Sequence, residues 1–518
     1  MQAGGNAVDA AVATGLALAV THPSAGNLGG GGFMVLRMAD GRTAALDFRE
    51  TAPMAARTEM YLGIDGQLVP GSNHAGFRAV GVPGTVAGFD LALKRYGTRS
   101  WRELTQTAVT LADAGFPLTP ALAHEFAALK SDWLRHPASA AVFLKPDGST
   151  YQVGETWRQP DLARTLRRLQ EKGRDGFYRG ETAQLLAEEM KRHGGLITRS
   201  DLTHYRALSR TPVRGKYRGL EIISMPPPSS GGTAIIEMLN VLESFDLKAL
   251  GHDSPAYIHL LAETMRRAFA DRARFLGDPD VNPGMPSRIK RLTSKPYAAQ
   301  LAHGIRPDAV SMSDASKLSE IYESPHTTHY SVIDAAGNSV VVTYTLEESY
   351  GSRLVADGLG FLLNNEMGDF NPQPGRTDST GLIGTSPNLI RPGHRMLSSM
   401  SPTILLRDGR PWLLIGSPGG RTIINTVLQV ILNSVDFQQN LSEAIGAGRI
   451  HHQWLPDELV VEPGVLTAET RLGLERLGHR VRVGETQGRA MGIAVEPVTG
   501  NRTGVADPRD PDGAAAGY

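Results

Sequence analysis

The 518-residue sequence contains no cysteine, which excludes disulfide bonds, a thiolate nucleophile and cysteine-ligated metal. It has no excess of charge of either sign, because 53 basic side chains balance 53 acidic ones. Proteins dedicated to binding nucleic acid or anionic membranes usually carry a basic excess, so neither function is expected. The composition is otherwise that of an ordinary globular protein, with 41% hydrophobic and 20% charged residues.

Long hydrophobic runs are also missing, since a membrane-spanning helix needs about 20 consecutive apolar residues. The most apolar stretch, residues 6–20, contains Asp9, has no basic leader and is followed by a glycine-rich segment rather than a cleavage site. This is not the pattern of a signal peptide. We expect a buried, alanine-rich helix that ends near His22 and Pro23.

Helical patterns dominate the first two thirds of the sequence. Ser254 is the expected N-cap of a long helix with Pro255 at its first position. Residues 175–195 predict another helix, which ends at two glycines. Residues 225–233 (MPPPSSGGT) predict a rigid loop that leads into an apolar helix.

The pattern changes after residue 326, where short strands separated by tight turns begin. Two hairpins are expected, one turning at residues 336–338 and the other at residues 408–409. Helices are expected at residues 422–447 and 467–477, and a polar tail from about Asp507. Pairs of strands flanked by helices predict layered sheets that helices cover.

Two clusters favour structural explanations over ligand binding. Residues 26–33 (GNLGGGGF) lack the ending of a phosphate-binding loop and follow a helix, so close backbone packing is the better explanation. His451 and His452 are adjacent and point to different sides of any element, which excludes a two-histidine metal face. No other grouping of His, Asp and Glu has the spacing of metal ligands, so neither a metal nor another cofactor is expected.

Thr327 and Thr328 mark the boundary between the two patterns. They open an alternating apolar segment (HTTHYSV, residues 326–332) directly after a segment with the features of a loop. The simpler explanation is that β-branched threonine suits the end of a strand. The alternative is that Thr327 becomes an N-terminus, and spacing alone does not decide between the two.

Three further stretches carry groups that could take part in catalysis. Residues 417–420 (SPGG) join an apolar strand to a helix, where backbone N–H groups can hold an oxyanion, although a plain turn has the same pattern. Glu366 and Asp369 are three residues apart and could face one ligand ammonium or a solvated surface. Ser398 and Ser399 could hold a carboxylate or cap a turn.

Read together and in order, the motifs make this sequence similar to the γ-glutamyltransferase (glutathione hydrolase) family of N-terminal nucleophile hydrolases. The resemblance runs from residue 4 to the end of the chain. It rests on the segments GGNAVDAAVA, THPSAGNLGGGGFM, LDFRETAP, GVPGTVAGF, MPPPSSGG, ADRARFLGDPD, TTHYSVIDAAGNSVVVTYTL, LLNNEMGDF, MLSSMSPT and GSPGG. It implies an α/β fold in which the whole chain forms one four-layer αββα sandwich with antiparallel central sheets.

The resemblance also implies an inactive precursor that cuts itself between His326 and Thr327. Residues 1–326 would become the large subunit and residues 327–518 the small subunit of a heterodimer. Thr327 Oγ1 would attack the carbonyl group of His326, and the resulting ester would be hydrolysed. The freed α-amino group, with an unperturbed pKa of about 7.7–8.0, could then accept the hydroxyl proton as the catalytic base.

Catalytic roles come from the same resemblance. Thr327 would attack the γ-carbonyl of a γ-glutamyl amide such as glutathione, while the N–H groups of Gly419 and Gly420 would hold the oxyanion. Thr345 would hydrogen-bond the nucleophile and assist maturation. From one γ-glutamyl-enzyme ester, water would complete hydrolysis, and an amino acid or peptide amine would complete transpeptidation.

Substrate-binding roles complete what the resemblance implies. The Arg49 guanidinium would clamp the substrate α-carboxylate as a bidentate fork, helped by Ser398 and Ser399. Asp369, with Glu366, would face the α-ammonium group.

The sequence departs from the family pattern in three places. Glu347 stands where many members carry asparagine beside the α-amino group, and we hypothesise that it tightens selection for a free α-amine. Residues 370–388 correspond to a lid loop in which Thr380 replaces an aromatic gate, so a more open pocket is expected. Members carry roughly a further helix and strand before residue 4, so Met1 is expected to be a truncated or misassigned start; the family is exported, which implies a periplasmic or secreted protein.

Two alternatives remain open. A cephalosporin (glutaryl) acylase has the same scaffold and nucleophile, but its substrate lacks the α-amine, so Glu347, Glu366 and Asp369 would lose their partner. An unprocessed homologue could act only as a binding protein, and the complete set of catalytic residues argues against that alternative.

Overall fold

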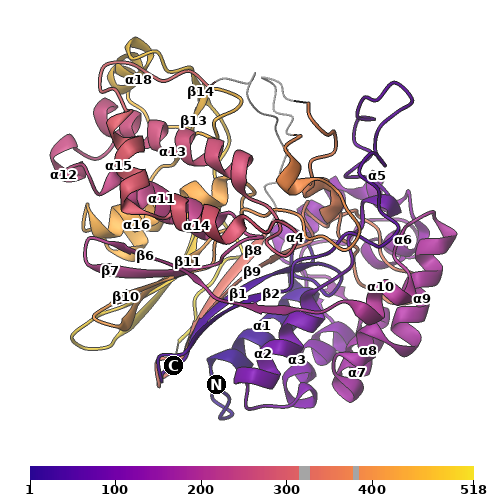
Figure 1. Ribbon diagram of the computed structural model, residues 1–518. Helices are drawn as coiled ribbons and strands as arrows, with labels where there is room; N and C mark the ends of the chain where they lie inside the picture. The colour runs from indigo at the N-terminus through magenta and orange to yellow at the C-terminus, as the bar shows by residue number, and fades with distance from the viewer. Residues whose placement is uncertain (314–326, 377–383, 518) are drawn as a thin grey trace.

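The computed structural model describes residues 1–313, 327–376 and 384–517. Two antiparallel β-sheets pack face to face, and helices cover the outer face of each sheet (Figure 1). The expected four-layer αββα sandwich is therefore confirmed. His326 and Thr380 lie outside the described residues.

The first sheet has the strand order β5-β2-β1-β9-β8. Its strands are β1 (Gly31–Arg37), β2 (Thr43–Asp47), β5 (Leu208–Arg210), β8 (Thr328–Ile333) and β9 (Ser339–Thr345). Successive residues of β1 face opposite sides, as strand geometry requires: Phe33 and Val35 pack toward the second sheet, and Met34 and Leu36 pack toward the helices.

The second sheet has the strand order β16-β15-β11-β10-β7-β6. Its strands are β6 (Val213–Tyr217), β7 (Leu220–Ser224), β10 (Thr403–Arg407), β11 (Arg410–Gly416), β15 (Met491–Val495) and β16 (Arg502–Ala506). Smaller sheets contain β3 (Phe116–Pro117) with β4 (Thr156–Trp157), and β12 (Ile450–His451) with β13 (Leu459–Val461) and β14 (Val481–Val483). Both large sheets combine strands from before residue 314 with strands from after residue 326, so each segment completes its sheets only with the other.

Two groups of helices form the outer layers, one on each large sheet (Figure 1). The group on the first sheet includes α1 (Ala7–Thr21), α2 (Thr85–Tyr96), α3 (Trp101–Ala114), α7 (Pro160–Lys172), α8 (Asp175–Tyr178), α9 (Gly180–Arg192) and α10 (Arg199–His204). The group on the second sheet includes α11 (Gly231–Leu242), α13 (Pro255–Phe275), α16 (Thr422–Val435), α17 (Leu441–Gly446) and α18 (Ala468–Arg476). The remaining helices are α4 (Pro120–Ala128), α5 (Lys130–Trp133), α6 (Pro137–Phe143), α12 (Leu247–Leu250), α14 (Met285–Leu292) and α15 (Lys295–His303).

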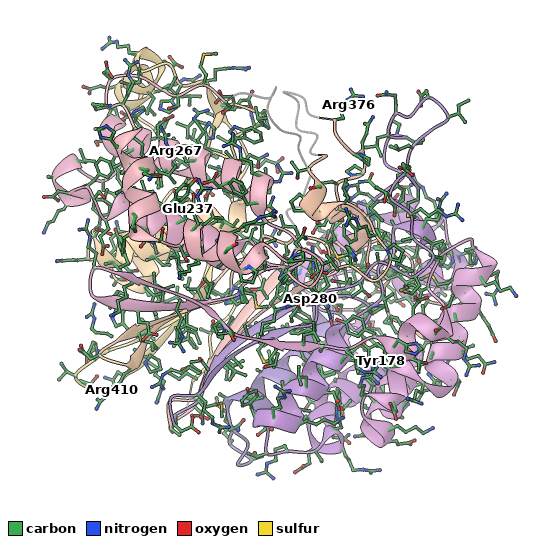
Figure 2. All side chains as sticks on the ribbon, viewed as in Figure 1. Tyr178, Glu237, Arg267, Asp280, Arg376 and Arg410 are labelled. Carbon is green, nitrogen blue, oxygen red and sulfur yellow. The ribbon has the colours of Figure 1, made fainter. Side chains whose placement is uncertain are left out.

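Side chains fill the spaces between these layers (Figure 2), and charged groups around Asp47 join the two segments. Arg210 Nε lies 2.7 Å from Asp47 Oδ2, and Arg210 Nη2 lies 2.7 Å from Asp280 Oδ2. Arg395 Nε lies 3.4 Å from Asp47 Oδ1, which also accepts a 3.0 Å hydrogen bond from the backbone N–H of Arg49. This network fixes the turn that follows β2.

Several sequence predictions are confirmed. The alanine-rich segment forms α1 and ends at Thr21, and Ser254 caps α13 by accepting a 3.1 Å hydrogen bond from Tyr257 N–H. The hairpins β8–β9 and β10–β11 turn where glycine and polar residues predicted. Their turn residues and alternating patterns are local signals, so sequence alone was sufficient.

Three predictions are wrong in part. The region before residue 314 is mainly helical as expected, but it also supplies five strands of the two large sheets; β1, β2 and β7 are largely buried and show little alternation, and β5 has only three residues. The helix expected at residues 175–195 is divided into α8 and α9, since Arg179 is extended and Gly180 has a φ of +60°. Asp507 begins no free tail: it is buried, and its carboxylate accepts hydrogen bonds from Arg449 and from the Ala490 N–H group.

Within the part of the chain that the structure describes, no helix combines the length and the apolar character needed to cross a membrane.

Candidate active site

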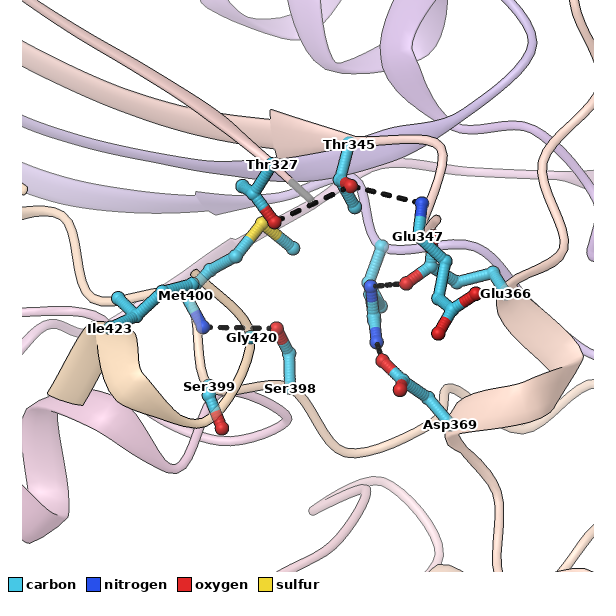
Figure 3. Close-up of a pocket in the computed structure, with 11 residues that line it drawn as sticks. Thr327, Thr345, Glu347, Glu366, Asp369, Ser398, Ser399, Met400, Gly420 and Ile423 are labelled. Atoms are coloured by element: carbon cyan, nitrogen blue, oxygen red, sulfur yellow. Dashed lines mark hydrogen bonds and ion pairs between the residues drawn. The ribbon is translucent and has the colours of Figure 1, made fainter. Parts of the chain in front are cut away.

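Two threonine hydroxyl groups lie next to each other at one end of the first sheet. β8 and β9 are antiparallel, with Thr328 opposite Tyr344. Thr327 therefore lies beside Thr345, and its Oγ1 donates to Thr345 Oγ1 over 3.5 Å (Figure 3). The backbone N–H group of Glu347 donates to the same Thr345 oxygen over 2.9 Å. The register of the hairpin thus brings both hydroxyls together.

The glycine cluster allows the chain to approach Thr345 closely. β1 pairs with β9, with Gly31 opposite Thr345. A Cβ atom at Gly30 would lie 2.0 Å from the carbonyl oxygen of Thr345, and Asn27 Nδ2 donates to that oxygen over 2.8 Å. The prediction of close backbone packing is confirmed, and the packing fixes the end of β9.

A buried guanidinium group lines the same cavity as the threonines. Arg49 forms ion pairs with Glu366 and Asp369, the first and last residues of the 3₁₀ helix η3 (Glu366–Asp369). Arg49 Nε and Nη2 also donate to the carbonyl oxygens of Met396 and Leu397, each over 3.3 Å. The short helix directs both carboxylates toward one cation, which the three-residue spacing permits.

Carboxyl groups outnumber cations around Arg49. Glu50 Oε2 lies 3.8 Å from Arg49 Nη1, and Glu347 lines the cavity. Burial alone would lower the pKa of Arg49, but Glu366, Asp369 and Glu50 raise that pKa above its ordinary value. Burial raises the pKa of Glu366 well above its ordinary value; Arg49 opposes this, and Glu50 and Glu347 add to it. A second cation placed here would favour the ionised form of these carboxyl groups and would pair with it.

The two serines lie on the cavity wall before β10. Ser398 Oγ accepts a 3.1 Å hydrogen bond from Met400 N–H, and Ser399 Oγ accepts one of 3.1 Å from Arg272 Nη2. The Ser399 hydroxyl therefore points toward α13 and away from Thr327 (Figure 3). Sequence analysis did not single out Arg272, because a basic residue within a helical pattern has no distinctive signal.

The turn after β11 brings the start of a helix to the cavity. Gly419 and Gly420 have φ values of +133° and +54°, a region that favours glycine, and α16 begins at Thr422. Gly420 lines the cavity, and Gly419 packs against Thr422, whose Oγ1 would lie 2.5 Å from an added Cβ. Backbone N–H groups at a helix start have no intrahelical partners, so they are suited to an oxyanion.

Among the described residues, the imidazole nearest to Thr327 in sequence is that of His329, which serves the core rather than the nucleophile. His329 Nδ1 lies 2.8 Å from Thr343 Oγ1, and its Nε2 lies 3.1 Å from Ser331 Oγ. Burial lowers the pKa of His329 to about 3, so the ring is neutral at physiological pH. It packs against Gly416, where an added Cβ would lie 2.2 Å away.

The predicted groups converge on one cavity. It is lined by Arg49, Thr327, Thr345, Glu347, Glu366, Asp369, Ser398, Ser399, Met400, Gly420 and Ile423. Sequence analysis missed two neighbours, Glu50 and His74. His74 Nδ1 lies 3.5 Å from Glu347 Oε2, and its ring packs against Gly368 in η3. Loop residues of this kind carry no spacing signal that would have revealed them.

Comparison with known proteins identifies the family. The sequence model of gamma-glutamyltranspeptidase matches residues 1–517. The chain belongs to this family. The glutathione hydrolase proenzyme of Escherichia coli K12 is 47% identical over 100% of this chain and 89% of its own length.

Solved structures extend the gamma-glutamyltranspeptidase assignment to the fold. The cephalosporin acylase of Bacillus halodurans superposes with a TM-score of 0.84 at 28% identity, over 98% of this chain and 91% of that chain. The gamma-glutamyltranspeptidase of Helicobacter pylori superposes with a TM-score of 0.58 at 45% identity, over 60% of this chain and 88% of that chain. The same fold therefore occurs in a cephalosporin acylase and in a gamma-glutamyltranspeptidase. The fold alone does not identify the substrate, so the residues that line the cavity must be considered.

Proposed function

We propose that this protein is a self-cleaving γ-glutamyltransferase that transfers the γ-glutamyl group of glutathione and related amides to water, amino acids or peptides. One observation carries the proposal: Thr327 shares a cavity with a guanidinium group and an excess of carboxyl groups. A γ-glutamyl substrate has one carboxylate and one ammonium group close to its reacting amide, and the cavity offers a partner for each. The E. coli relative is named a glutathione hydrolase proenzyme, which supports both the reaction and the precursor.

Maturation begins with the hydroxyl group of Thr327. Its oxygen attacks the carbonyl carbon of His326, an ester C–O bond forms, the peptide C–N bond breaks, and the hydroxyl proton ends on the new amine. Water then hydrolyses the ester and leaves residues 1–326 and 327–518. The products remain one heterodimer, because β1 pairs with β9 and β7 pairs with β10 across the two segments.

The new N-terminus supplies the base for catalysis. An α-amino group has an unperturbed pKa of about 7.7–8.0, so a large fraction is neutral near physiological pH. It accepts the Thr327 hydroxyl proton as Oγ1 attacks the γ-carbonyl, and Gly419 and Gly420 N–H groups hold the oxyanion. The leaving amine takes the proton, and water or an acceptor amine then releases the γ-glutamyl group from the ester. The hydrogen bond to Thr345 Oγ1 orients the Thr327 hydroxyl group.

Substrate binding exchanges one set of ion pairs for another. Arg49 is already neutralised by Glu366 and Asp369, so a lone carboxylate gains little by entering. A zwitterionic substrate brings an ammonium group to these carboxylates while its α-carboxylate binds Arg49, with Ser398 and Ser399 beside it. The number of ion pairs is then kept and every buried charge has a partner, which is the condition for a favourable buried site.

The main competing function is glutaryl acylase activity, since the B. halodurans acylase shares the fold. A glutaryl group carries the carboxylate but no ammonium. It would leave the carboxyl groups around Arg49 without a new cation, and an uncompensated buried charge is costly. The excess of carboxyl groups therefore favours the γ-glutamyl substrate.

Three anilides test the proposed function directly. γ-Glutamyl p-nitroanilide carries both charges, glutaryl p-nitroanilide lacks the amine, and 4-aminobutyryl p-nitroanilide lacks the carboxylate. We expect kcat/KM for the γ-glutamyl compound to exceed each of the others by on the order of 100-fold, because charged hydrogen bonds contribute about 1.5–3 kcal/mol each. Glutaryl turnover equal to γ-glutamyl turnover would identify an acylase instead.

Glu347 is predicted to strengthen selection for the α-amine. The Glu347→Asn variant is expected to raise KM for γ-glutamyl p-nitroanilide about tenfold and to reduce its preference over the glutaryl compound by the same factor. Position 347 has a φ of +83°, which asparagine tolerates, so the backbone N–H bond to Thr345 should survive. Glu348→Gln is the matched control. An unchanged KM in Glu347→Asn would exclude Glu347 from the ammonium site.

A further inference from the structure

A second cluster of ionisable side chains lies in the helical layer on the first sheet, outside the cavity. Glu189 lies in the last turn of α9, and His193 follows at its C-cap, so the two are four residues apart on one face. His136 is the N-cap residue of α6, which lies beside α9 (Figure 1). One ligand atom from each of the three side chains lies within 4.8 Å of the other two.

The distances between the three side chains are those of ion pairs and also suit ligands of one metal ion. Glu189 Oε1 lies 3.3 Å from His136 Nε2 and 3.5 Å from His193 Nε2, longer than the usual 2.7–3.2 Å of an N–H···O hydrogen bond. Ligands at about 2.0–2.1 Å from a tetrahedral Zn²⁺ ion stand about 3.3–3.4 Å apart. Two edges of such a tetrahedron are therefore already present.

Neighbouring groups hold the three ligands in this arrangement. Arg192 Nη1 donates to Glu189 Oε2 over 2.6 Å, which leaves Oε1 toward the imidazoles. The Phe77 ring stacks on His193 with centroids 4.6 Å apart and an interplanar angle of 11°. Such outer partners orient metal ligands in proteins. His136 is buried, and among the described residues its Nδ1 has no hydrogen-bond partner, so the contact of its Nε2 with Glu189 is what orients the ring.

We propose that His136, Glu189 and His193 form a binding site for a divalent transition-metal ion such as Zn²⁺. Two imidazoles and one carboxylate are donors that such ions prefer. His193 is partly exposed, so solvent completes the coordination. The sequence-based expectation that no grouping has ligand spacing is wrong here: Glu189 and His193 have it, and the third ligand comes from a distant segment.

The site would act as a structural clamp rather than in the reaction. It would join the start of α6 to the end of α9, and the Phe77 stacking would extend the clamp to η1 (Phe77–Ala79). A ligand that binds the folded state alone stabilises that state. Zn²⁺ should therefore raise the unfolding temperature of the protein without being required for γ-glutamyl transfer.

Calorimetric titration of the tag-free, chelator-treated protein with Zn²⁺ tests the site. We expect binding by the wild type that is weakened at least about tenfold in His193→Gln and in Glu189→Gln, and unchanged in the matched control His204→Gln, an exposed histidine on α10. Co²⁺ should give the intense visible absorption of a tetrahedral ion in the wild type and not in His193→Gln. Zn²⁺ should raise the unfolding temperature of the wild type and of His204→Gln only.

Three results would overturn the proposal. One is a wild-type protein that binds no Zn²⁺. Another is equal Zn²⁺ affinity in the wild type and in His193→Gln. Because His193 is exposed, this variant should fold normally, and circular dichroism checks that it does. The third is loss of binding in His74→Gln instead, because His74, Glu347 and Glu348 form a separate group of possible ligands and the ion would then belong to the active site.

Discussion

The Thr327→Ala variant is expected to remain one 518-residue chain and to lose γ-glutamyl transfer by on the order of 10⁶-fold, as when the nucleophile of a catalytic triad is removed. Alanine has no hydroxyl to attack the preceding carbonyl, so neither the ester nor the N-terminal base can form. Intact mass under denaturing conditions measures the first effect. The wild type should give two fragments, 1–326 and 327–518, whose masses sum to the precursor plus one water.

Two control variants separate the hydroxyl from the strand that carries it. Thr327→Ser keeps a nucleophilic oxygen and should still be cut, whereas Thr328→Ala changes the adjacent residue of β8 and should be cut and active. Cleavage of Thr327→Ala at the same bond would show that another group, or a contaminating protease, makes the cut. A wild-type chain that is folded but whole would contradict the proposed maturation.

The fold could be predicted where its signals are local. The hairpin from Thr328 to Thr345 combines an Asp-Ala-Ala-Gly-Asn turn with β-branched strands, and the structure follows it. β1 could not be predicted, because it begins with two glycines that serve contacts with β9 and its residues are buried on both faces. Pairing between β7 and β10 joins distant segments, which periodicity in one segment cannot reveal.

In the site, too, local features could be predicted from the sequence and contacts between distant segments could not. Thr327 and the turn at Gly419 stand at visible boundaries between patterns, so both could be singled out from the sequence. The four carboxyl groups around Arg49 come from three separate segments, and only the fold brings Glu50 and Glu347 to the pair in η3. The motif resemblance supplied the roles of Thr327, Gly419 and the carboxylate pair in η3, and physical reasoning from spacing alone left each of them with a simpler structural explanation.

The Arg49→Lys variant should lower kcat/KM for γ-glutamyl p-nitroanilide by about 100-fold, or ~2.7 kcal/mol. The guanidinium uses separate nitrogens for Glu366 and Asp369 and additional donors for two carbonyl groups. A lysine ammonium is a point charge with three donors, so it cannot hold both carboxylates and a bidentate substrate carboxylate together. Lysine is preferable to alanine as the test, because leaving buried carboxylates without a cation costs about 3–5 kcal/mol and would confuse folding with binding.

The substrate pair distinguishes recognition of the α-carboxylate from a general loss of structure. If Arg49 binds that group, the variant should lose γ-glutamyl turnover while its slow turnover of 4-aminobutyryl p-nitroanilide, which has no carboxylate, stays within about threefold, under 1 kcal/mol. Arg449→Lys is the matched control: Arg449 is also buried and paired with an aspartate, Asp507, but neither residue lines the cavity, so the ratio between substrates should not change. An equal fall for both anilides in Arg49→Lys would mean that Arg49 acts by holding η3 in place. The carboxylate would then need another partner, and buried Arg272, which donates to Ser399 on the cavity wall, is a candidate.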